Sequence, residues 1–560
     1  MSKNIFIGVA WPYVNGDLHV GHLAGYLLPC DICARYHRAV GHKVLMVSGS
    51  DCHGTPITVE ADKRGATPKE IADEYHEKDT HLFRDLLGIT YDIYTRTDTP
   101  HHAKVTQDIF MSLLDAGYIF VVYTKQYFSS EEKRFLPDRY VVGVCPFCGA
   151  ADTRSDQCDS CGKLIAVGEL INPKSNLSKK SVDLKETQHY FVDWSKLQPE
   201  IEKYVERVSG GWKVWVSQET KGWLKEGLKP RPITRDIDWG VELPKDRIPE
   251  AMLIDGIENK RLYVWFDAVI GYLSASLLWT KEGYGNWQDF WYGSNVKHYY
   301  FMGKDNLAFH TLFWPGKLMV YDKNLHLPDV VSINMFLNFD GRQFSKSRGV
   351  AIDTKALVEQ YGNDRVRFYI TLIMPETRDT SFSWDDFREK VNGVLVGNVG
   401  NFVHRSLSIA RSADIDAVLA EKLQESVKKE VGETFTAIRK YLENCEFRNA
   451  LDVVISLSSF GNRLVDSYKI WELDKSSRQY FQAVKNLYFI ILTLGYLFIP
   501  LLPEASKKVF KLLGLVEDSS WPAEGEEVDF LETRLAKIDT RIEPAPLFGK
   551  IDRIGGGTHG

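Results

Sequence analysis

The sequence predicts an α/β domain built on a parallel sheet, interrupted by a turn-rich insertion and followed by an all-α helical bundle. Residues 5–10 and 43–48 are apolar, strand-like runs on either side of an expected helix over 20–40, which is the pattern of a parallel βαβ unit. From 118 to 240, turns and clustered cysteines replace this alternation. After about residue 384 the apolar positions step by three and four, as in amphipathic helices.

Length and composition indicate a folded protein with several packed units. A chain of 560 residues is too long for a single hydrophobic core. It is 44% hydrophobic and has 14 Trp, which excludes a disordered, collagen-like or low-complexity protein. The formal net charge of −6 excludes a uniformly basic coat for nucleic acid.

The cysteines and the apolar segments indicate a cytoplasmic protein without membrane contact. Four of the eight Cys fall within 145–161 and the rest are scattered, unlike a secreted disulfide framework. Residues 1–13 lack the basic stretch and apolar run of a signal peptide. The run 487–502 is short for a membrane span and contains Gly495 and Pro500, so we interpret it as a core helix of the bundle.

The turn after the first strand lies where a parallel sheet binds its ligands, beyond the carboxyl ends of the strands. Neither a Gly-x-Gly-x-x-Gly motif nor a Walker-type Gly-Lys-Ser/Thr follows residues 5–10, which excludes the usual dinucleotide and P-loop sites. Strand–helix alternation resumes at 262–279 and 297–314. The segment 118–240 is therefore predicted to be inserted between two halves of one domain.

His19-Val20-Gly21-His22 is a candidate phosphate site. The two histidines share one face at the start of the expected helix, where free backbone N–H groups and the helix dipole attract phosphate. Gly21 leaves room for a nucleotide against the backbone. Taken alone, the pattern fits two surface histidines equally well.

A second candidate phosphate site is the loop 344–349, FSKSRG. Lys346 stands between Ser345 and Ser347, with Arg342 and Arg348 on either side, so the loop can close over a triphosphate. A solvated basic loop is the simpler interpretation of this segment by itself.

Together and in this order, the two motifs resemble the HIGH and KMSKS signatures of class I aminoacyl-tRNA synthetases. Further segments narrow the resemblance to the methionyl-tRNA synthetase family over nearly the whole chain, up to about Ile551. They are 10–16 (AWPYVNG), 51–56 (DCHGTP), 264–268 (VWFDA) and 303–305 (GKD), with His310.

The resemblance implies a Rossmann-like catalytic domain with a zinc-binding insertion, followed by an all-α anticodon-binding bundle. The implied boundaries are 1–117 and 241–325 for the two catalytic halves, 118–240 for the connective insertion with a zinc knuckle at 145–161, 326–384 for the KMSKS-like loop and stem-contact region, 385–545 for the helical anticodon-binding domain and 546–560 for a tail.

The activity that the resemblance implies is ATP-dependent activation of L-methionine to methionyl-adenylate, followed by transfer to the 3′ end of initiator and elongator tRNA(Met). Mg²⁺ would accompany ATP. His19, His22 and Lys346 would be catalytic, because in-line attack on the α-phosphate needs alignment and charge neutralisation more than a protein nucleophile. The implied ATP-binding residues are His19, His22, Gly303, Asp305, Ser345, Lys346 and Ser347.

The resemblance also implies a methionine pocket. Asp51 would pair with the substrate ammonium and Arg235 with its carboxylate, while the hydroxyl of Tyr272 would donate to the weakly accepting thioether sulfur. The other implied pocket residues are Trp11, Tyr13, Trp265, Ala268 and His310. One departure from the family pattern is Gln343, which stands where a first Lys is usual, and Arg342 is a candidate substitute.

Cys145-x-x-Cys148 and Cys158-x-x-Cys161 form a zinc-knuckle pattern. Four thiolates close a tetrahedral site and leave no open position, so we expect one structural Zn²⁺ without a catalytic role. A reducible disulfide pair and an empty site are the alternatives.

Asn401, Arg405 and Trp471 match the positions that this family uses to read the CAU anticodon. Asn401 and Arg405 share a helix face at i and i+4. RNA readers stack unpaired bases on aromatic side chains and bind their edges, a role that Trp471 suits. A Trp buried in the bundle is the alternative.

Other functions fit part of the pattern. Class I synthetases for Ile, Val or Leu need a much longer editing insertion, and a cysteinyl enzyme places its metal in the amino-acid pocket. A small nucleotidyltransferase would lack the bundle, and a non-catalytic RNA-binding relative should have lost His19, His22 or Lys346. We expect a monomer, since no C-terminal dimerisation domain follows 546–560.

Overall fold

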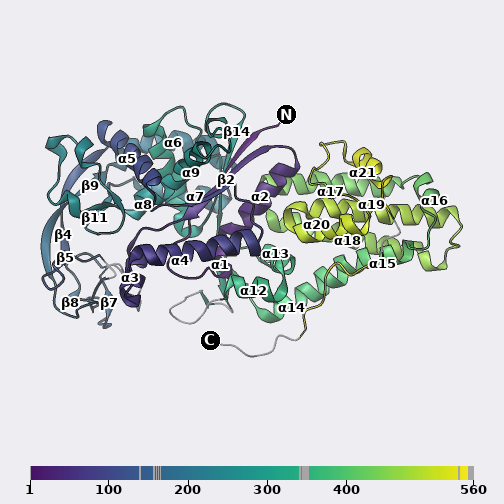
Figure 1. Ribbon diagram of the computed structural model, residues 1–560, viewed down its shortest axis with the longest axis horizontal. Coiled ribbons are helices and arrows are strands. Elements are labelled where there is room, and N and C mark those ends of the chain that lie inside the picture. Colours follow the sequence, from purple (N-terminus) through teal and green to yellow (C-terminus); the bar gives the residue numbers. More distant parts are fainter. Residues whose placement is uncertain are drawn as a thin grey trace.

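The computed structural model describes residues 2–137, 140–155, 158, 160–161, 163, 165–339, 342–343, 352–539 and 543–552. Figure 1 shows an elongated molecule, with an α/β part at one end of the long axis and a helical bundle at the other. This is the predicted fold class.

The central sheet of the α/β part has five parallel strands in the order β15-β14-β1-β2-β3. Chain order reverses between β1 and β14, so the topological switch point lies there. The strands are β1 (Asn4–Val9), β2 (Lys43–Ser50), β3 (Ile93–Arg96), β14 (Val296–Gly303) and β15 (Val330–Asn334).

The predicted βαβ unit is confirmed. β1 and β2 are hydrogen-bonded in parallel, and a nearly continuous helix connects them. This helix consists of α1 (Val20–His22), the π-helical turn η1 (Leu23–Leu27) and α2 (Leu28–Ala39). β1 is apolar on both faces, and Ile5, Phe6 and Ile7 are fully buried. This is typical of a parallel strand that is covered by helices on both sides.

Further helices complete the α/β part. They are α3 (Thr55–Arg64), α4 (Pro68–His81), η2 (Leu82–Leu86), α5 (Pro100–Asp115), α8 (Val264–Asp267), α9 (Gly271–Lys281), α10 (Gln288–Trp291), η10 (Phe309–Phe313) and α11 (Trp314–Tyr321).

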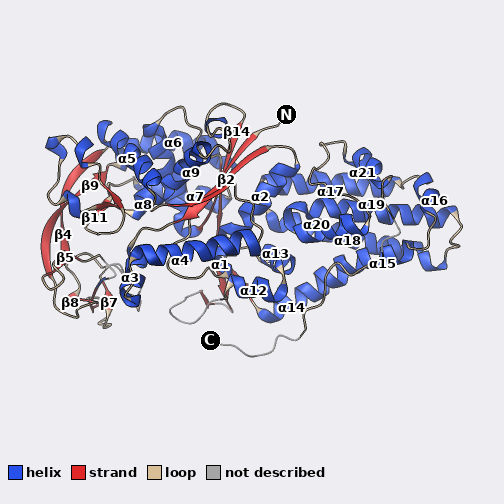
Figure 2. Ribbon diagram, in the orientation of Figure 1, coloured by secondary structure: helices blue, strands red, loops and turns tan. Residues whose placement is uncertain are grey.

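The segment between β3 and β14 includes a mostly antiparallel region that Figure 2 shows at one end of the molecule. Its main sheet consists of β4 (Ile119–Ser129), β5 (Arg134–Phe135), β9 (Asp183–Val192) and β10 (Arg231–Pro232). A small sheet carries the cysteines and consists of β6 (Val141–Val144), β7 (Thr153–Arg154) and β8 (Ile171–Ser175). Next follow α6 (Trp194–Val208), α7 (Val214–Glu226), β11 (Thr234–Arg235), β12 (Val241–Glu242) and β13 (Arg261–Leu262).

A small mixed sheet and two helices connect the α/β part to the bundle. They are β16 (Leu337–Phe339), β17 (Arg342–Gln343), β18 (Thr380–Phe382), α12 (Thr354–Tyr361) and α13 (Asn363–Leu372). The bundle comprises α14 (Trp384–Lys390), η12 (Val391–Gly400), α15 (Asn401–Ala410), α16 (Ile415–Ala420), α17 (Glu425–Glu443), α18 (Phe447–Tyr468), α19 (Arg478–Leu501), α20 (Pro503–Leu512) and α21 (Glu527–Leu535).

α19 is the core helix of the bundle, as predicted from the run 487–502. It is long and apolar enough to cross a membrane, but 94% of its most apolar window is buried inside the protein. It also packs against α2 of the α/β part. The buried guanidinium of Arg367 joins the two parts, donating to Asp31 Oδ2 at 2.7 Å and to the carbonyls of Pro500 and Leu501.

Candidate active site

A cavity of about 670 Å³ lies at the carboxyl ends of four strands of the central sheet. This is the switch point, where open α/β sheets bind their ligands. Its lining residues follow β1 (Ala10, Trp11, Pro12, Tyr13), β2 (Asp51), β14 (Gly303, Asp305, Asn306) and β15 (Met335, Phe336, Leu337).

The cavity brings together most of the residues predicted from the sequence. They are Trp11, Tyr13, His19, His22, Asp51, Trp265, Ala268, Tyr272, Gly303, Asp305 and His310. Ser345, Lys346 and Ser347 lie outside the described residues. A larger cavity of about 840 Å³ lies against the insertion, but none of the predicted substrate residues lines it.

His19 and His22 stand at the start of the helix as predicted. His19 is the N-cap of α1, and its Nδ1 accepts from the N–H of Gly21 at 3.1 Å. Because Nδ1 accepts, the neutral imidazole carries its proton on Nε2. The two rings lie 4.1 Å apart between centroids. The pair therefore offers donors at a helix N-terminus, where phosphate binds favourably.

Asp51 is a buried carboxyl group at the end of β2. Its backbone is fixed by the bond from its N–H to the carbonyl of Pro12, at 2.8 Å. Burial and the negative charge of Asp267 raise the pKa of Asp51 well above its usual value, and only the N–H of His53 opposes them. A cationic group beside Asp51 would reverse this shift, so the site suits a substrate ammonium.

The aromatic wall of the cavity depends on two glycines. A Cβ on Gly49 or Gly271 would meet the indole of Trp11 at 2.5 and 2.6 Å, so only glycine leaves room for this ring. Trp265 is stacked on Phe309, with centroids 4.4 Å apart and planes at 12°. These fixed aromatic rings form a rigid apolar surface, which suits an apolar ligand of complementary shape.

Arg235 is not brought into this cavity. Its guanidinium lies over the ring of Tyr263 at 4.3 Å and donates to the carbonyl of Thr234. It lines a neighbouring cavity of about 270 Å³, to which Trp265 also contributes. Trp265 thus lines both cavities, the first together with Asp51 and the second together with Arg235.

Sequence reasoning missed several lining residues, namely Gly25, Tyr26, Met335, Phe336 and Leu337. Two signals could have found them. Tyr26 is four residues after His22 and contacts its ring edge-on at 6.2 Å. The last three residues follow the buried strand β15, at the same sheet edge as Asp51.

The four predicted cysteines gather into one cluster. Their sulfur atoms all lie within 4.8 Å of one another, with Cys145 and Cys161 at 3.9 Å and Cys148 and Cys158 at 3.7 Å. The backbone N–H of Cys161 lowers the pKa of Cys158 to about 6. Four thiols at this spacing, one of them readily ionised, could hold a zinc ion.

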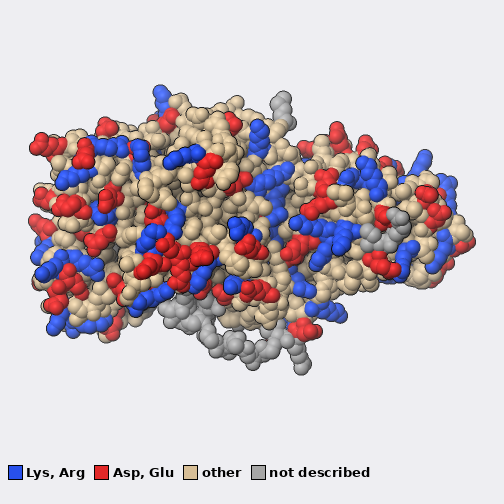
Figure 3. Space-filling model, viewed as in Figure 1, with Lys and Arg blue, Asp and Glu red and all other residues tan. Residues whose placement is uncertain are grey.

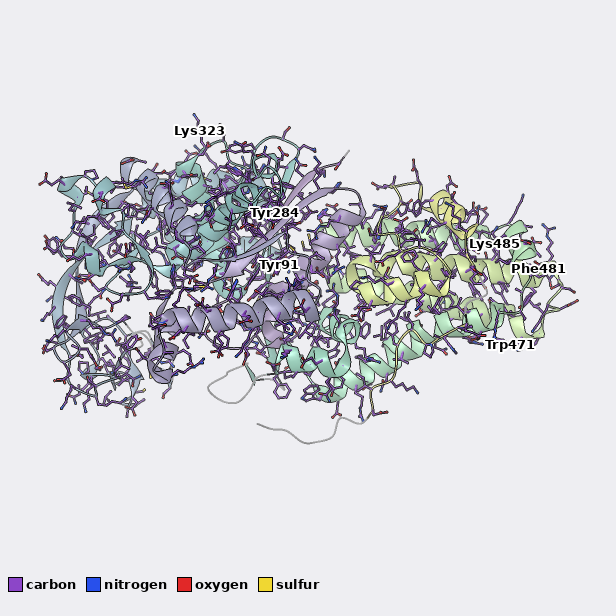
Figure 4. The ribbon with its side chains drawn as sticks, in the orientation of Figure 1. Tyr91, Tyr284, Lys323, Trp471, Phe481 and Lys485 are labelled. Atoms are coloured by element: carbon purple, nitrogen blue, oxygen red, sulfur yellow. The ribbon has the colours of Figure 1, made fainter. Side chains whose placement is uncertain are left out.

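At the far end of the bundle, Trp471 is an exposed side chain with 57% of its surface accessible (Figure 4). The alternative of a Trp buried in the bundle is therefore wrong. The guanidinium of Arg405 lies 5.3 Å from the centre of the indole ring and pairs with Asp466 at 2.9 Å. Asn401 is exposed at the start of the same helix, α15.

The surface around these residues carries both signs of charge. Figure 3 shows Lys and Arg interspersed with Asp and Glu over this face, rather than gathered into one basic stripe. This agrees with the net charge of −6. Recognition of an acidic partner would thus depend on local contacts.

Two family models match the chain in succession. The model described as tRNA synthetases class I (M) matches residues 5–407, and the model described as anticodon binding domain of methionyl tRNA ligase matches 417–553. The first model ends within α15, and the second begins within α16.

Similar proteins cover almost the whole chain. A methionine–tRNA ligase of Dehalococcoides mccartyi strain CBDB1 is 41% identical, over 99% of this chain and 98% of its own length. One from Roseiflexus castenholzii is 40% identical, over 92% and 87%.

Among solved structures, methionyl-tRNA synthetase of Mycobacterium tuberculosis in complex with methionyl-adenylate has the same fold. Its TM-score is 0.75 at 21% identity, over 98% of this chain and 99% of that one. The family models and the curated relatives show that the chain belongs to the methionyl-tRNA synthetase family of class I aminoacyl-tRNA synthetases.

Proposed function

We propose that this protein is a methionine–tRNA ligase. It activates L-methionine with ATP to methionyl-adenylate and transfers the methionyl group to the 3′ end of initiator and elongator tRNA(Met). The observation that carries the proposal is the cavity at the switch point, where His19, His22 and Asp51 meet an aromatic wall in a chain of this family.

The phosphate chemistry is assigned to the helix start. His19 and His22 donate to the α-phosphate as the methionine carboxylate attacks it, because charge on the phosphate oxygens grows in the transition state. Gly303 and Asp305 receive adenine and ribose. Lys346, between Ser345 and Ser347, holds the β- and γ-phosphates as pyrophosphate departs, and Mg²⁺ accompanies the nucleotide.

The amino acid is held at its two ends. Asp51 pairs with the ammonium, and Trp11, Tyr13, Trp265, Ala268, Tyr272 and His310 enclose the thioether side chain. Arg235 is our candidate partner for the carboxylate, and to reach it the guanidinium would have to leave the ring of Tyr263.

The remaining assignments concern the metal and the RNA. Cys145, Cys148, Cys158 and Cys161 hold one structural Zn²⁺, which would stabilise the small sheet of the insertion. Asn401, Arg405 and Trp471 read the CAU anticodon, while the insertion and residues 326–384 contact the acceptor end. We expect a cytoplasmic monomer.

Pyrophosphate exchange with each of the twenty amino acids tests the proposal. Methionine should support exchange selectively, with ATP and Mg²⁺. Stronger exchange with isoleucine, valine or cysteine would indicate another class I synthetase. Binding of tRNA without any exchange would indicate a non-catalytic RNA-binding protein.

A further inference from the structure

A second group of metal-ligating side chains lies far from the cysteines, where the α/β part meets the bundle. His37 is in α2, His42 follows it in the turn before β2, and Glu443 is the last residue of α17. One ligand atom from each side chain lies within 4.8 Å of the other two. Figure 1 shows α2 and α17 next to each other at this junction.

Local backbone geometry brings the two histidines together. Gly41 has a φ of +82°, which ends the helix, and the N–H of His42 then bonds to the carbonyl of His37 at 2.9 Å. The two rings stack with centroids 5.5 Å apart and planes at 23°. Both imidazoles are thereby placed beside Glu443.

His37 is the most unusual member of the group. Only 1% of its surface is exposed, and neither ring nitrogen has a hydrogen-bond partner among the described residues. A neutral imidazole leaves one ring nitrogen with a free lone pair, which is the atom that a metal ion binds. A buried imidazole without a hydrogen-bond partner lowers the stability of the fold, and a bound ligand would remove this cost.

Glu443 is held in place by three neighbours. The hydroxyl of Tyr36 donates to Oε1 at 3.2 Å, the hydroxyl of Tyr299 donates to Oε2 at 3.3 Å, and the ammonium of Lys297 lies 3.4 Å from Oε2. Hydrogen bonds of this kind orient carboxylates that bind metals.

We propose that His37, His42 and Glu443 form a second metal site, which takes Zn²⁺ or a similar imidazole-preferring divalent ion. Two imidazoles and a carboxylate are a common zinc donor set, with water in the fourth position. Zn–N bonds of about 2.0–2.1 Å require donor atoms roughly 3.3 Å apart, so the side chains must close slightly around the ion. Mg²⁺ and Ca²⁺ prefer all-oxygen sites and do not fit.

Nearby charges and thiols decide how tightly the ion binds. Lys297 lies beside Glu443, and the positive charge of Lys3 acts on His42, whose Nδ1 accepts from the backbone N–H of Lys3 at 3.3 Å. Both charges oppose a divalent cation, so this site should bind the ion more weakly than the four cysteines do. Cys33 also lies in this region. Its sulfur is not among the ligand atoms that lie within 4.8 Å of one another in this group, so Cys33 is not one of the proposed ligands.

The ligands come from both parts of the molecule. His37 and His42 belong to the βαβ unit, and Glu443 belongs to the bundle. A bound ion would therefore tie the two parts together, independently of the reaction in the cavity.

The test counts zinc in the full-length protein. Wild type is loaded with excess Zn²⁺ and freed of unbound metal by gel filtration. It should retain one zinc more per chain than Glu443→Gln or His42→Gln, whatever the cysteine cluster holds. The matched control is His81→Gln, which removes an exposed histidine paired with Asp85 and should retain the wild-type number. Equal counts in wild type and Glu443→Gln would overturn the proposal.

Cobalt distinguishes the two sites by their donors. Co²⁺ bound to thiolates gives an intense near-ultraviolet charge-transfer band, which nitrogen and oxygen donors do not give. The Co²⁺ ion that is lost in Glu443→Gln should contribute only weak visible bands to the wild-type spectrum. In His42→Gln, the affinity of this site for the ion should fall at least about 10-fold. A thiolate band from that ion would overturn the assignment. Melting curves recorded without metal separate misfolding from loss of a ligand, and His42, half-exposed, is the safer position.

Discussion

The hydroxyl of Tyr272 lies 2.7 Å from Nε2 of His310 on the wall of the cavity. His310 Nδ1 lies 2.9 Å from the carbonyl of Asn306, which can only accept, so Nδ1 carries the ring proton. Burial lowers the pKa of His310 to about 4, so the ring is neutral at pH 7 and Nε2 is an acceptor. The Tyr272 proton therefore points to His310, whereas the family resemblance implies that it points to the methionine sulfur.

The first prediction follows from this bond. Tyr272→Phe should raise the KM for methionine roughly 5-fold, because one hydrogen bond that shapes the pocket is lost. The KM for norleucine, which has a methylene in place of sulfur, should rise by the same factor. Pyrophosphate exchange with each amino acid gives the ratio of its KM in Tyr272→Phe to its KM in the wild type. A loss confined to methionine would show that the hydroxyl donates to sulfur after all.

The second prediction concerns pH. Burial and Asp267 raise the pKa of Asp51, so protonated Asp51 becomes more populated as pH falls and cannot pair with an ammonium. The KM for methionine should therefore rise towards low pH. Asp51→Asn should raise it roughly 10- to 100-fold at neutral pH and remove this dependence, since a charged hydrogen bond is lost. The KM for ATP serves as control. If the KM of Asp51→Asn for methionine still rose towards low pH as in the wild type, a group other than Asp51 would be responsible for the pH dependence.

The third prediction concerns the cysteine cluster. Cys148→Ser should reduce the zinc bound there and loosen the small sheet β6-β7-β8, because a structural thiolate site contributes directly to folding. Hydrogen exchange should rise in 141–175 and stay unchanged in the central sheet. Cys30→Ser, at a buried cysteine outside the cluster, is the control for general loss of stability. Unchanged exchange in 141–175 would argue against a structural ion.

The fourth prediction separates the two ends of the molecule. Trp471→Ala should weaken tRNA recognition by about 1–3 kcal/mol, because one base loses its stacking surface, and should leave methionine-dependent pyrophosphate exchange unchanged. Tyr284→Ala removes another exposed aromatic side chain, in the α/β part, and should affect neither assay (Figure 4). Equal losses in both assays for Trp471→Ala would mean that Trp471 is needed for folding instead.

The site residues whose positions depend on local sequence could be predicted. His19 and His22 follow from helix-start chemistry. The role of Asp51 came from the family resemblance, and its place directly after β2 sets it at the ligand-binding edge of the sheet. The position of Arg235 was not predictable, because it depends on the pairing of β11 with β13, opposite Arg261. This pairing sets the side chain on Tyr263. The grouping of His37 with Glu443 also has no local signal, since a contact between helices creates it.

The buried guanidinium of Arg367 has a consequence for protein engineering. Its three hydrogen bonds end on Asp31 in α2 and on Pro500 and Leu501 at the end of α19, the core helix of the bundle. Removing one side of such a buried pair typically costs about 3–5 kcal/mol. A chimera assembled from two relatives should therefore take α2, α13 and α19 from a single parent. An expression fragment that ends before the bundle would leave Arg367 without two of its acceptors.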